Sequence, residues 1–314
     1  ISARADVGAM PGARRAKRAT PSLAEDPRIS AWLNDADALS SWLAQHDLLR
    51  LLESNDGFVR IPNLLPDFVA KWALQAMQEL PELSWERTLS AERNDASYAD
   101  SIPHHFHLFE VEEHDALLAV SRLLWRLMPG SVPNFTAARY GPADHIAPHD
   151  DLVLERYTWK EVQQLEGKYD PPNATSESSF GMARWKGSRC FTREIAAVYY
   201  LNEAWPQDCG GLFRDLKTGR EYVPEFNTLI AFSVPRMHEV TAVEALRLKR
   251  YSIFGWWLKA SESAAGDDEQ RESEVLRPST AAKKRKKRST AAGTAVQRST
   301  AAATHQAAPE GTVG

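Results

Sequence analysis

Apolar residues recur at helical spacing in the first half of the chain. Residues 28–54 place them three and four positions apart, and the turn-forming residues 55–57 follow directly. Two further helices are expected at 66–80 and at about 113–128. Between the helical stretch at 28–54 and the helix at 66–80, the run FVRIPNLL at 58–65 predicts a strand. The pattern therefore indicates a helical region with one early strand.

From residue 134 onward the pattern changes to short β-branched or aromatic runs, punctuated by Gly, Pro and Asp. These runs are NFTAARYG, REIAAVYYLN, GGLFRDL, FNTLIAFSV and RLKRYSIFGWWL. Many short strands after a set of helices are typical of a barrel or jelly roll with helices packed outside. The fold class expected is mostly β with flanking helices.

The two ends of the chain cannot supply a core. Residues 1–26 are rich in Ala, Arg and Ser, which suits either a disordered basic leader or the remnant of a transit peptide. Residues 263–314 repeat STAA with a ten-residue period and hold the basic run KKRKKR, and we expect them to be disordered. One domain is therefore expected at 27–262, with N-terminal helices at 27–128 and a jelly-roll core at 134–260.

Charge is unevenly distributed. The chain holds 38 Lys and Arg against 42 Asp and Glu, but the first 24 and last 38 residues take 13 of the basic and only two of the acidic residues. The body keeps 25 basic against 40 acidic residues, a net charge near −15. An acidic body argues against a domain that wraps nucleic acid. No run of about eighteen apolar residues suggests a membrane span, and two cysteines without a CxxC spacing favour a reducing, intracellular compartment.

The segment RYGPADHIAPHDD places His149 and Asp151 two residues apart. On an extended strand such residues point to the same side, so an imidazole and a carboxylate could grip one metal ion. His238 follows the apolar strand LIAF and is well placed to supply a third ligand. Two histidines and one carboxylate form the facial triad of non-haem iron(II) oxygenases. An HxD pair alone is weak, because it arises by chance in many proteins.

Arg250 strengthens this interpretation. It begins RYSIFGWW, twelve residues after His238, on a predicted strand. A buried cation near an iron site needs an anion, and a guanidinium suits the distal carboxylate of 2-oxoglutarate. The alternative is that Arg250 pairs with an acid at the strand edge.

The order of these pieces resembles the prolyl 4-hydroxylase-like branch of the 2-oxoglutarate/Fe(II) dioxygenases. The resemblance runs through RYGPADHIAPHDD, AVYYLNEAWPQDCGGLFR, LIAFSVPRMHEV and RYSIFGWW, over residues 134–258. It implies a double-stranded β-helix, and an enzyme that uses Fe(II), 2-oxoglutarate and O₂ with ascorbate as its reductant.

The resemblance also implies roles for individual residues. The iron ligands would be His149, Asp151 and His238, and the 2-oxoglutarate site would hold Arg250, Tyr200, Tyr140 and Trp256. Strands bury aromatic residues whatever their function, so Tyr200 and Trp256 could equally be core aromatics.

Two features depart from the family pattern. The spacing from His238 to Arg250 is longer than usual, which leaves Arg247 as an alternative clamp, although the RYxIxGW context favours Arg250. Residues 152–193 form a long insertion after the HxD pair, which we expect to act as a lid over the substrate. An exposed insertion without function is the other possibility.

The substrate is the least determined part of the prediction. A hydroxylase acting on a protein or peptide residue such as proline is favoured. The alternatives are an oxygenase for a small molecule, a catalytically silent metal-binding module and a cupin-like zinc protein. Asp151 argues against a halogenase, and Trp256, six residues after Arg250, stands where a nucleic-acid demethylase usually carries a second arginine.

The basic run at Lys283–Arg288 suggests a partner of its own. Such runs bind nuclear import receptors or polyanions, or only keep a tail soluble. The location expected is therefore the nucleus or the cytoplasm.

Overall fold

The computed structural model describes residues 26–88, 104–170 and 180–261. All of them belong to one compact unit. The predictions for the leader at 1–26 and the tail at 263–314 fall almost entirely outside the described residues and stay predictions.

The N-terminal helical stretch is three helices rather than one: α1 (Pro27–Leu33), α2 (Ala36–Gln45) and α3 (Leu48–Ser54). Two aspartates divide it. The side chain of Asp35 accepts hydrogen bonds from the first turn of α2, and that of Asp47 does so for α3. Aspartate is a favoured residue at a helix N-cap, because its carboxylate accepts from the unpaired N–H groups there. The apolar residues keep their helical spacing across these breaks, so the spacing did not show where one helix ends and the next begins.

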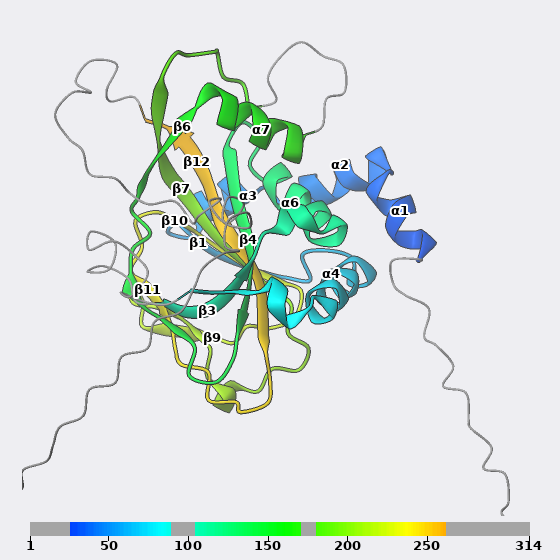
Figure 1. Ribbon diagram of the computed structural model, residues 1–314, viewed down its shortest axis with the longest axis vertical. Coiled ribbons are helices and arrows are strands. Elements are labelled where there is room, and N and C mark those ends of the chain that lie inside the picture. Colours follow the sequence, from blue (N-terminus) through cyan, green and yellow to red (C-terminus); the bar gives the residue numbers. More distant parts are fainter. Residues whose placement is uncertain (1–25, 89–103, 171–179, 262–314) are drawn as a thin grey trace, which may run out of the picture. The chain divides into compact units, whose positions relative to one another are not determined.

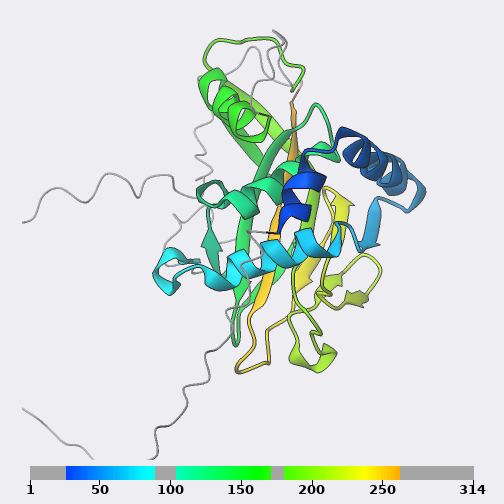
Figure 2. The same cartoon turned by 90° about the vertical axis from the view of Figure 1, so that its right-hand side faces the viewer.

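Two longer helices cover the sheet. They are α4 (Asp67–Glu79) and α6 (Asp115–Arg126), close to the predicted ranges. Each buries one apolar stripe, α4 packs against α6, and α6 in turn contacts the strands β4 and β12. The view in Figure 2 shows these helices lying across one face of the sheet. The described residues also hold three 3₁₀ turns: η2 (Glu82–Ser84), η3 (Val111–Glu113) and η4 (Gln207–Cys209).

The strands form a curled antiparallel sheet with two layers (Figure 1). The major layer runs in the order β1 (Phe58–Pro62), β10 (Thr228–Ser233), β7 (Ser188–Tyr200), β12 (Arg250–Ala260) and β4 (Val132–Tyr140). The minor layer runs β5 (His145–His149), β11 (His238–Val240), β8 (Phe213–Asp215) and β9 (Arg220–Tyr222).

One strand connects the two layers. β3 (His104–Phe109) pairs through its last residues with β4 and through its first residues with β5. Two short strands extend the major layer, since β2 (Glu86–Thr88) pairs with β3 and β6 (Leu154–Thr158) pairs with β7. The predicted jelly-roll core with flanking helices is confirmed. The barrel also includes β1, which matches the early strand expected at 58–65, and β2 and β3, which the sequence pattern did not predict.

The two layers face each other across an aromatic interior. Phe213 of the minor layer lies against Phe232 of the major layer, with ring centroids 5.6 Å apart. The other face of the major layer packs against the helices in the largest hydrophobic cluster of the protein. Side chains of β12 alternate between these two environments, so Arg250 faces the interior while Trp257 faces the helices.

The insertion after the HxD pair is partly built into the helical face. Its helix α7 (Trp159–Tyr169) begins with a capping box between Thr158 and Glu161. Val162 and Tyr169 are fully buried in the large cluster, where α7 contacts α6 and β4. The described part of the insertion therefore packs beside the barrel, and its action as a lid stays a prediction.

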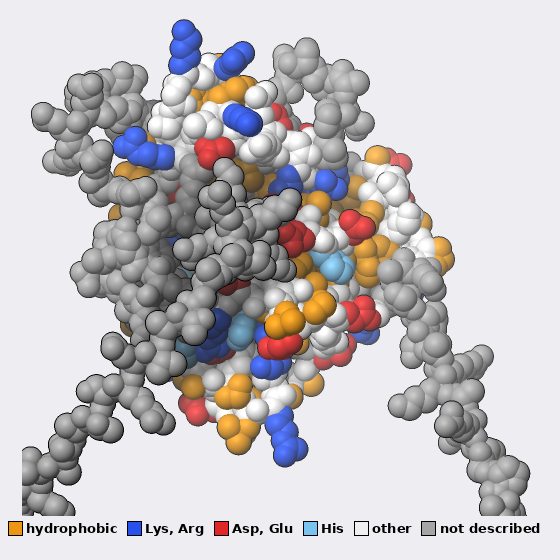
Figure 3. Space-filling model, in the orientation of Figure 1, with side chains coloured by type: hydrophobic (Ala, Val, Ile, Leu, Met, Phe, Trp, Pro, Cys, Tyr) orange, Lys and Arg blue, Asp and Glu red, His pale blue; other side chains and the backbone are white. Residues whose placement is uncertain are grey.

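The surface carries both signs of charge. On the face shown in Figure 3, acidic side chains are interspersed with basic ones. Among the described helices, none has the length and apolarity that a bilayer crossing requires.

Asn227 joins the segment between β1 and α4 to the barrel, and its loss should destabilise the fold. Its amide accepts from the N–H of Leu65 and donates to the carbonyl of Leu65, while the Tyr199 hydroxyl donates to it. We expect Asn227→Ala to cost about 2–4 kcal/mol, because buried backbone groups left unpaired cost roughly 1–3 kcal/mol each. Urea denaturation followed by circular dichroism measures the loss.

Asn63 is a matched control for that variant. Both asparagines have a left-handed backbone, with φ of 52° and 55°, but Asn63 is exposed. Asn63→Ala should therefore report the backbone strain alone, about 1 kcal/mol. Equal losses for the two variants would contradict the bonding role of Asn227.

Candidate metal centre

The two histidines of the predicted triad lie side by side on neighbouring strands. His149 is the last residue of β5 and His238 is the first residue of β11. The register of the two strands places them directly opposite each other, and their ring centroids are 4.0 Å apart. Antiparallel pairing thus brings together residues that are 89 positions apart in the sequence.

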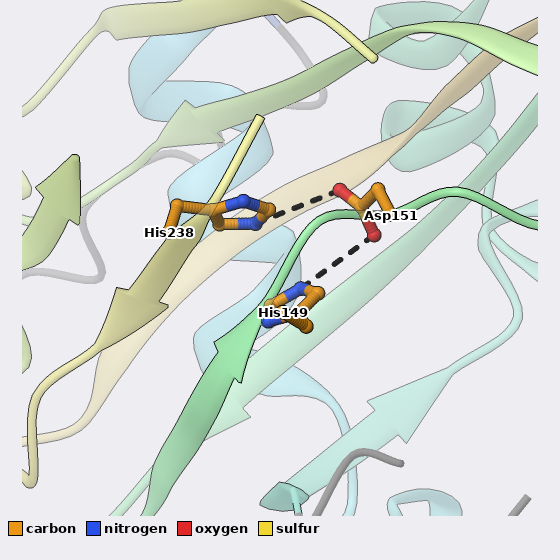
Figure 4. Close-up of side chains that lie close together, drawn as sticks. All are labelled: His149, Asp151 and His238. Atoms are coloured by element: carbon orange, nitrogen blue, oxygen red, sulfur yellow. Dashed lines mark ion pairs between the residues drawn. The ribbon is translucent and has the colours of Figure 1, made fainter. Parts of the chain in front are cut away.

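Asp151 completes the group by a different route from the one expected. Strand β5 ends at His149, and Asp151 has a left-handed backbone with φ of 63°, so the two residues do not share one face of an extended strand. The turn instead places the carboxylate beside the two imidazoles, with one oxygen facing each ring (Figure 4). Its Oδ1 lies 3.5 Å from His149 Nε2 and its Oδ2 lies 3.5 Å from His238 Nε2.

Backbone carbonyls fix the orientation of both rings. Nδ1 of His149 lies 2.9 Å from the carbonyl of Ala147, and Nδ1 of His238 lies 2.7 Å from that of Arg236. A carbonyl can only accept, so each Nδ1 must carry a proton, and a ring in its neutral form keeps its lone pair on Nε2. Both Nε2 atoms face Asp151, and one ligand atom from each of the three residues lies within 4.8 Å of the others.

Electrostatics keeps the group in a state that can bind a cation. Burial raises the pKa of Asp151, but the hydrogen bond from His149 and the nearby positive charges outweigh it and hold the pKa well below its usual range. Burial and the charge of His149 lower the pKa of His238 to about 4. For His149, burial lowers the pKa, but the hydrogen bond and charge of Asp151 outweigh burial and hold the pKa above its usual value. A divalent metal ion requires an ionised carboxylate and neutral imidazoles, so its binding would release the proton that Asp151 favours on His149.

Arg250 lies on the inner face of the major layer, almost completely buried at 1% exposure. Its guanidinium carbon sits 4.3 Å from the ring centre of Tyr140 and 5.0 Å from that of Tyr200. Within the described residues, none of its three guanidinium nitrogens has a hydrogen-bond partner, and neither does the Tyr200 hydroxyl. Arg247, the alternative clamp, is exposed and precedes β12.

One of two consecutive glycines makes room for this arginine. Gly210 and Gly211 both have a positive φ of 64°. A Cβ on Gly211 would lie 3.0 Å from Cδ of Arg250, and one on Gly210 would lie 2.0 Å from the carbonyl oxygen of Ala242. Gly211 therefore lets the backbone approach the arginine closely, and Gly210 lets it pass close to the backbone of Ala242.

The triad and Arg250 open onto the same interior. The ring of His238 stacks on Phe213 at 5.2 Å and meets the edge of Phe232 at 4.6 Å. Phe213 and Phe232 belong to the hydrophobic cluster that also contains Tyr200. Tyr200 contacts Arg250, so the chain of contacts runs from the triad to the arginine between the two layers.

A family comparison agrees with this geometry. The sequence model of the 2OG-Fe(II) oxygenase superfamily matches residues 135–258, which include the triad and Arg250. The chain carries a 2OG-Fe(II) oxygenase domain. The match covers strands β4 to β12 and leaves the N-terminal helices outside it.

Solved structures with a similar architecture include three oxygenases. A prolyl-4-hydroxylase from Pseudomonas putida shares 19% identity, with 69% of this chain and 97% of that chain covered and a TM-score of 0.41. A prolyl hydroxylase from Trichoplax adhaerens, solved with a peptide fragment, shares 17% identity over 71% and 93%, with a TM-score of 0.46. A 2OG-Fe(II) oxygenase family protein from Burkholderia pseudomallei shares 17% over 71% and 92%, with a TM-score of 0.36. Likenesses of this size say nothing about substrate, and the comparison with curated proteins found no match.

Trp256 packs against the cluster that contains Tyr200, and it also contacts an arginine near the triad. Its ring is stacked under the guanidinium of Arg193, 3.4 Å from the ring centre, and Arg193 Nη1 lies 3.5 Å from Asp151 Oδ1. Arg193 Nε donates to Glu155 at 2.9 Å. The structure thus connects Trp256 to Asp151 through an arginine that the sequence did not single out.

Sequence reasoning missed Arg193, Glu155 and Ser252. Ser252 shares the inner face with Arg250 at two residues' distance, and its buried hydroxyl has no hydrogen-bond partner among the described residues. The alternation of side chains along a strand places Ser252 on the same face as Arg250, and this signal could have identified it. Arg193 and Glu155 are 38 residues apart and meet only because β6 pairs with β7, so no local pattern marks them.

Proposed function

We propose that this chain is an Fe(II)- and 2-oxoglutarate-dependent hydroxylase that inserts oxygen into a C–H bond of a protein or peptide residue such as proline. The observation that carries the proposal is the buried His149–Asp151–His238 group facing the same interior as a buried Arg250 that has no hydrogen-bond partner among the described residues. In this assignment the three triad residues hold iron on one side. Arg250 binds the co-substrate on the other.

The donor set suits iron(II). Two imidazole nitrogens and one carboxylate bind on one face of the ion and leave its remaining positions for co-substrate and O₂. The surrounding rings of Phe213 and Phe232 keep this side of the site apolar. When bound, the iron and 2-oxoglutarate supply the oxidation, in which one oxygen atom of O₂ enters the substrate and the other enters succinate as CO₂ leaves.

Arg250 suits the distal carboxylate of 2-oxoglutarate. A guanidinium presents parallel N–H donors that match the two oxygens of a carboxylate. A buried cation without an anionic partner is costly, and the free energy is recovered when a dicarboxylate binds. We assign Tyr200 and Tyr140, which contact Arg250, to the same pocket, and Trp256 to the wall near the metal.

The choice of a protein or peptide residue rests on the motif order, which resembles the prolyl 4-hydroxylase-like branch. The test incubates the protein with iron(II), ascorbate and 2-oxoglutarate, and screens peptides by mass spectrometry for a gain of one oxygen atom. Succinate must form in step with the product. Succinate formed only with small molecules would move the substrate to that class.

Zinc binding without turnover is the rival that shares the ligands. A protein that binds iron and zinc, but neither binds nor consumes 2-oxoglutarate, would be a silent metal-binding module. The unpaired Arg250 argues against this, because zinc alone has no use for a buried carboxylate clamp.

The basic tail is expected to act on location and not on catalysis. Lys283–Arg288 lies outside the described residues, and we propose that it binds a nuclear import receptor or a polyanion. Deleting residues 277–314 should leave turnover of a small peptide unchanged and should shift a fluorescent fusion from nucleus to cytoplasm.

A full-length variant with six glutamines in place of KKRKKR removes the charge of the run but keeps the length of the tail. A fluorescent fusion of this variant should also shift from nucleus to cytoplasm. Unchanged distribution in both variants would remove the nuclear role. Loss of activity on deletion would mean that the tail supports the catalytic domain.

A further inference from the structure

A buried ion pair adjoins the strand that carries His238. Arg236 donates from Nε and Nη2 to the two carboxylate oxygens of Asp215, at 3.0 Å and 2.7 Å. Asp215 is completely buried and Arg236 is 6% exposed. The proposed reaction assigns neither residue a role.

The pair is fully bonded and tightly held. Asp215 also accepts from the Thr218 hydroxyl at 2.6 Å and from the Lys217 N–H at 3.2 Å. Arg236 donates from Nη1 to the carbonyl of Asp56 at 3.0 Å, and its guanidinium lies over the ring of Phe58 at 4.9 Å. A buried network in which each group is satisfied rigidifies its surroundings.

The main chain of Arg236 contacts both segments that carry metal ligands. Its carbonyl accepts from Nδ1 of His238 at 2.7 Å. Its N–H donates to the carbonyl of Asp150 at 3.2 Å, the residue between His149 and Asp151. Asp215, in turn, is the cross-strand partner of His238 on the side away from β5.

Stability alone is a weak reason for such a pair. Burying two charges costs so much desolvation that well-packed apolar residues often serve a fold equally well. What apolar residues lack is directional bonding. The bidentate bond restrains the Arg236 side chain in two directions, and the Arg236 carbonyl accepts from the ring of His238.

We propose that the Asp215–Arg236 pair positions His238 for the metal, with Arg236 as a positioning residue that acts through its carbonyl. The inference rests on the proposed function, because it takes His238 as an iron ligand. Partners of this kind, one bond behind a metal ligand, typically contribute a factor of about 10 to 100 in metal affinity.

The test measures metal affinity and not turnover. Co(II), a spectroscopic substitute for Fe(II), is titrated anaerobically into wild type, Asp215→Asn and Arg236→Met. We expect each variant to bind Co(II) about 10- to 100-fold more weakly, with altered ligand-field absorption bands that report changed coordination. Arg236→Lys keeps the charge but loses the fork, and should fall between.

Arg214→Gln is the matched control. Arg214 precedes Asp215 on β8 and pairs with Glu221 and Glu239, but its side chain is 40% exposed. It should leave the affinity and the bands unchanged. Should a single variant fail to fold, the double variant Asp215→Leu/Arg236→Met replaces the pair by apolar groups. It should fold, and it should still bind Co(II) weakly.

Wild-type affinity and bands in the folded single variants, or in the double variant, would overturn the positioning role. A loss in affinity that the Arg214→Gln control shares would overturn it too. A different result is wild type binding Co(II) no better than His238→Ala. That outcome overturns the proposed metal site itself and this inference with it.

Discussion

Asp151→Ala is expected to abolish iron-dependent succinate formation while the protein stays folded. Asp151 is the anionic member of the triad, and its two oxygens lie 3.5 Å from Nε2 of His149 and of His238. Removing it leaves two neutral or repelling imidazoles with no charge to offset that of the metal. The loss should exceed the roughly 10- to 100-fold effect of changing a residue behind a ligand. His149→Ala and His238→Ala should lose turnover to the same extent.

The neighbouring acid provides the control. The HDD run offers two aspartates, and the Oδ1 of Asp150 accepts from the N–H of Leu152 at 3.0 Å and does not face the histidines. Asp150→Asn keeps that bond and should retain turnover. Succinate formation and circular dichroism are measured on the same samples. Near-normal turnover in Asp151→Ala would mean that the metal ligands are assigned wrongly.

Hydrophobic periodicity predicted the elements whose apolar residues are uninterrupted. The helix α4 and the strands β1 and β12 were predicted close to their observed ranges, because each has a clear buried face. β3 was missed, since its sequence HHFHLF interrupts the apolar pattern with histidines. β5 was read as extended beyond its end, although Asp151 turns left-handed immediately after it.

Site residues were predictable where a motif carried them. HxD, the later histidine and RxxxxxW are local patterns, and the structure brings His149, Asp151 and His238 together. Register across strands is not local. The contacts of Arg193 with Glu155 and of Arg236 with Asp215 join residues 38 and 21 positions apart. Only the pairing of strands shows which polar residues meet. The contacts of Arg193 with Glu155 and of Arg236 with Asp215 could therefore not be predicted from the sequence.

Arg250→Ala is expected to raise the KM for 2-oxoglutarate far more than it weakens iron binding. The side chain is buried against Tyr140 and Tyr200 with all three guanidinium nitrogens unpaired within the described residues, which suits an arginine that takes its partner from the co-substrate. Losing a desolvated, charge-assisted pair costs about 2–5 kcal/mol, a factor of roughly 30 or more. Steady-state succinate formation gives the KM, and anaerobic titration gives the iron affinity.

Two further variants make this prediction decisive. Arg247→Ala removes the exposed arginine at the spacing closer to the family pattern, and it should change the KM little. Arg250→Lys keeps a positive charge but offers no fork, so its KM should lie between those of wild type and Arg250→Ala. A KM that rises more in Arg247→Ala than in Arg250→Ala would transfer the carboxylate clamp to Arg247. The clamp would then lie outside the buried interior, in the loop before β12, and the loop would have to close over the co-substrate for binding.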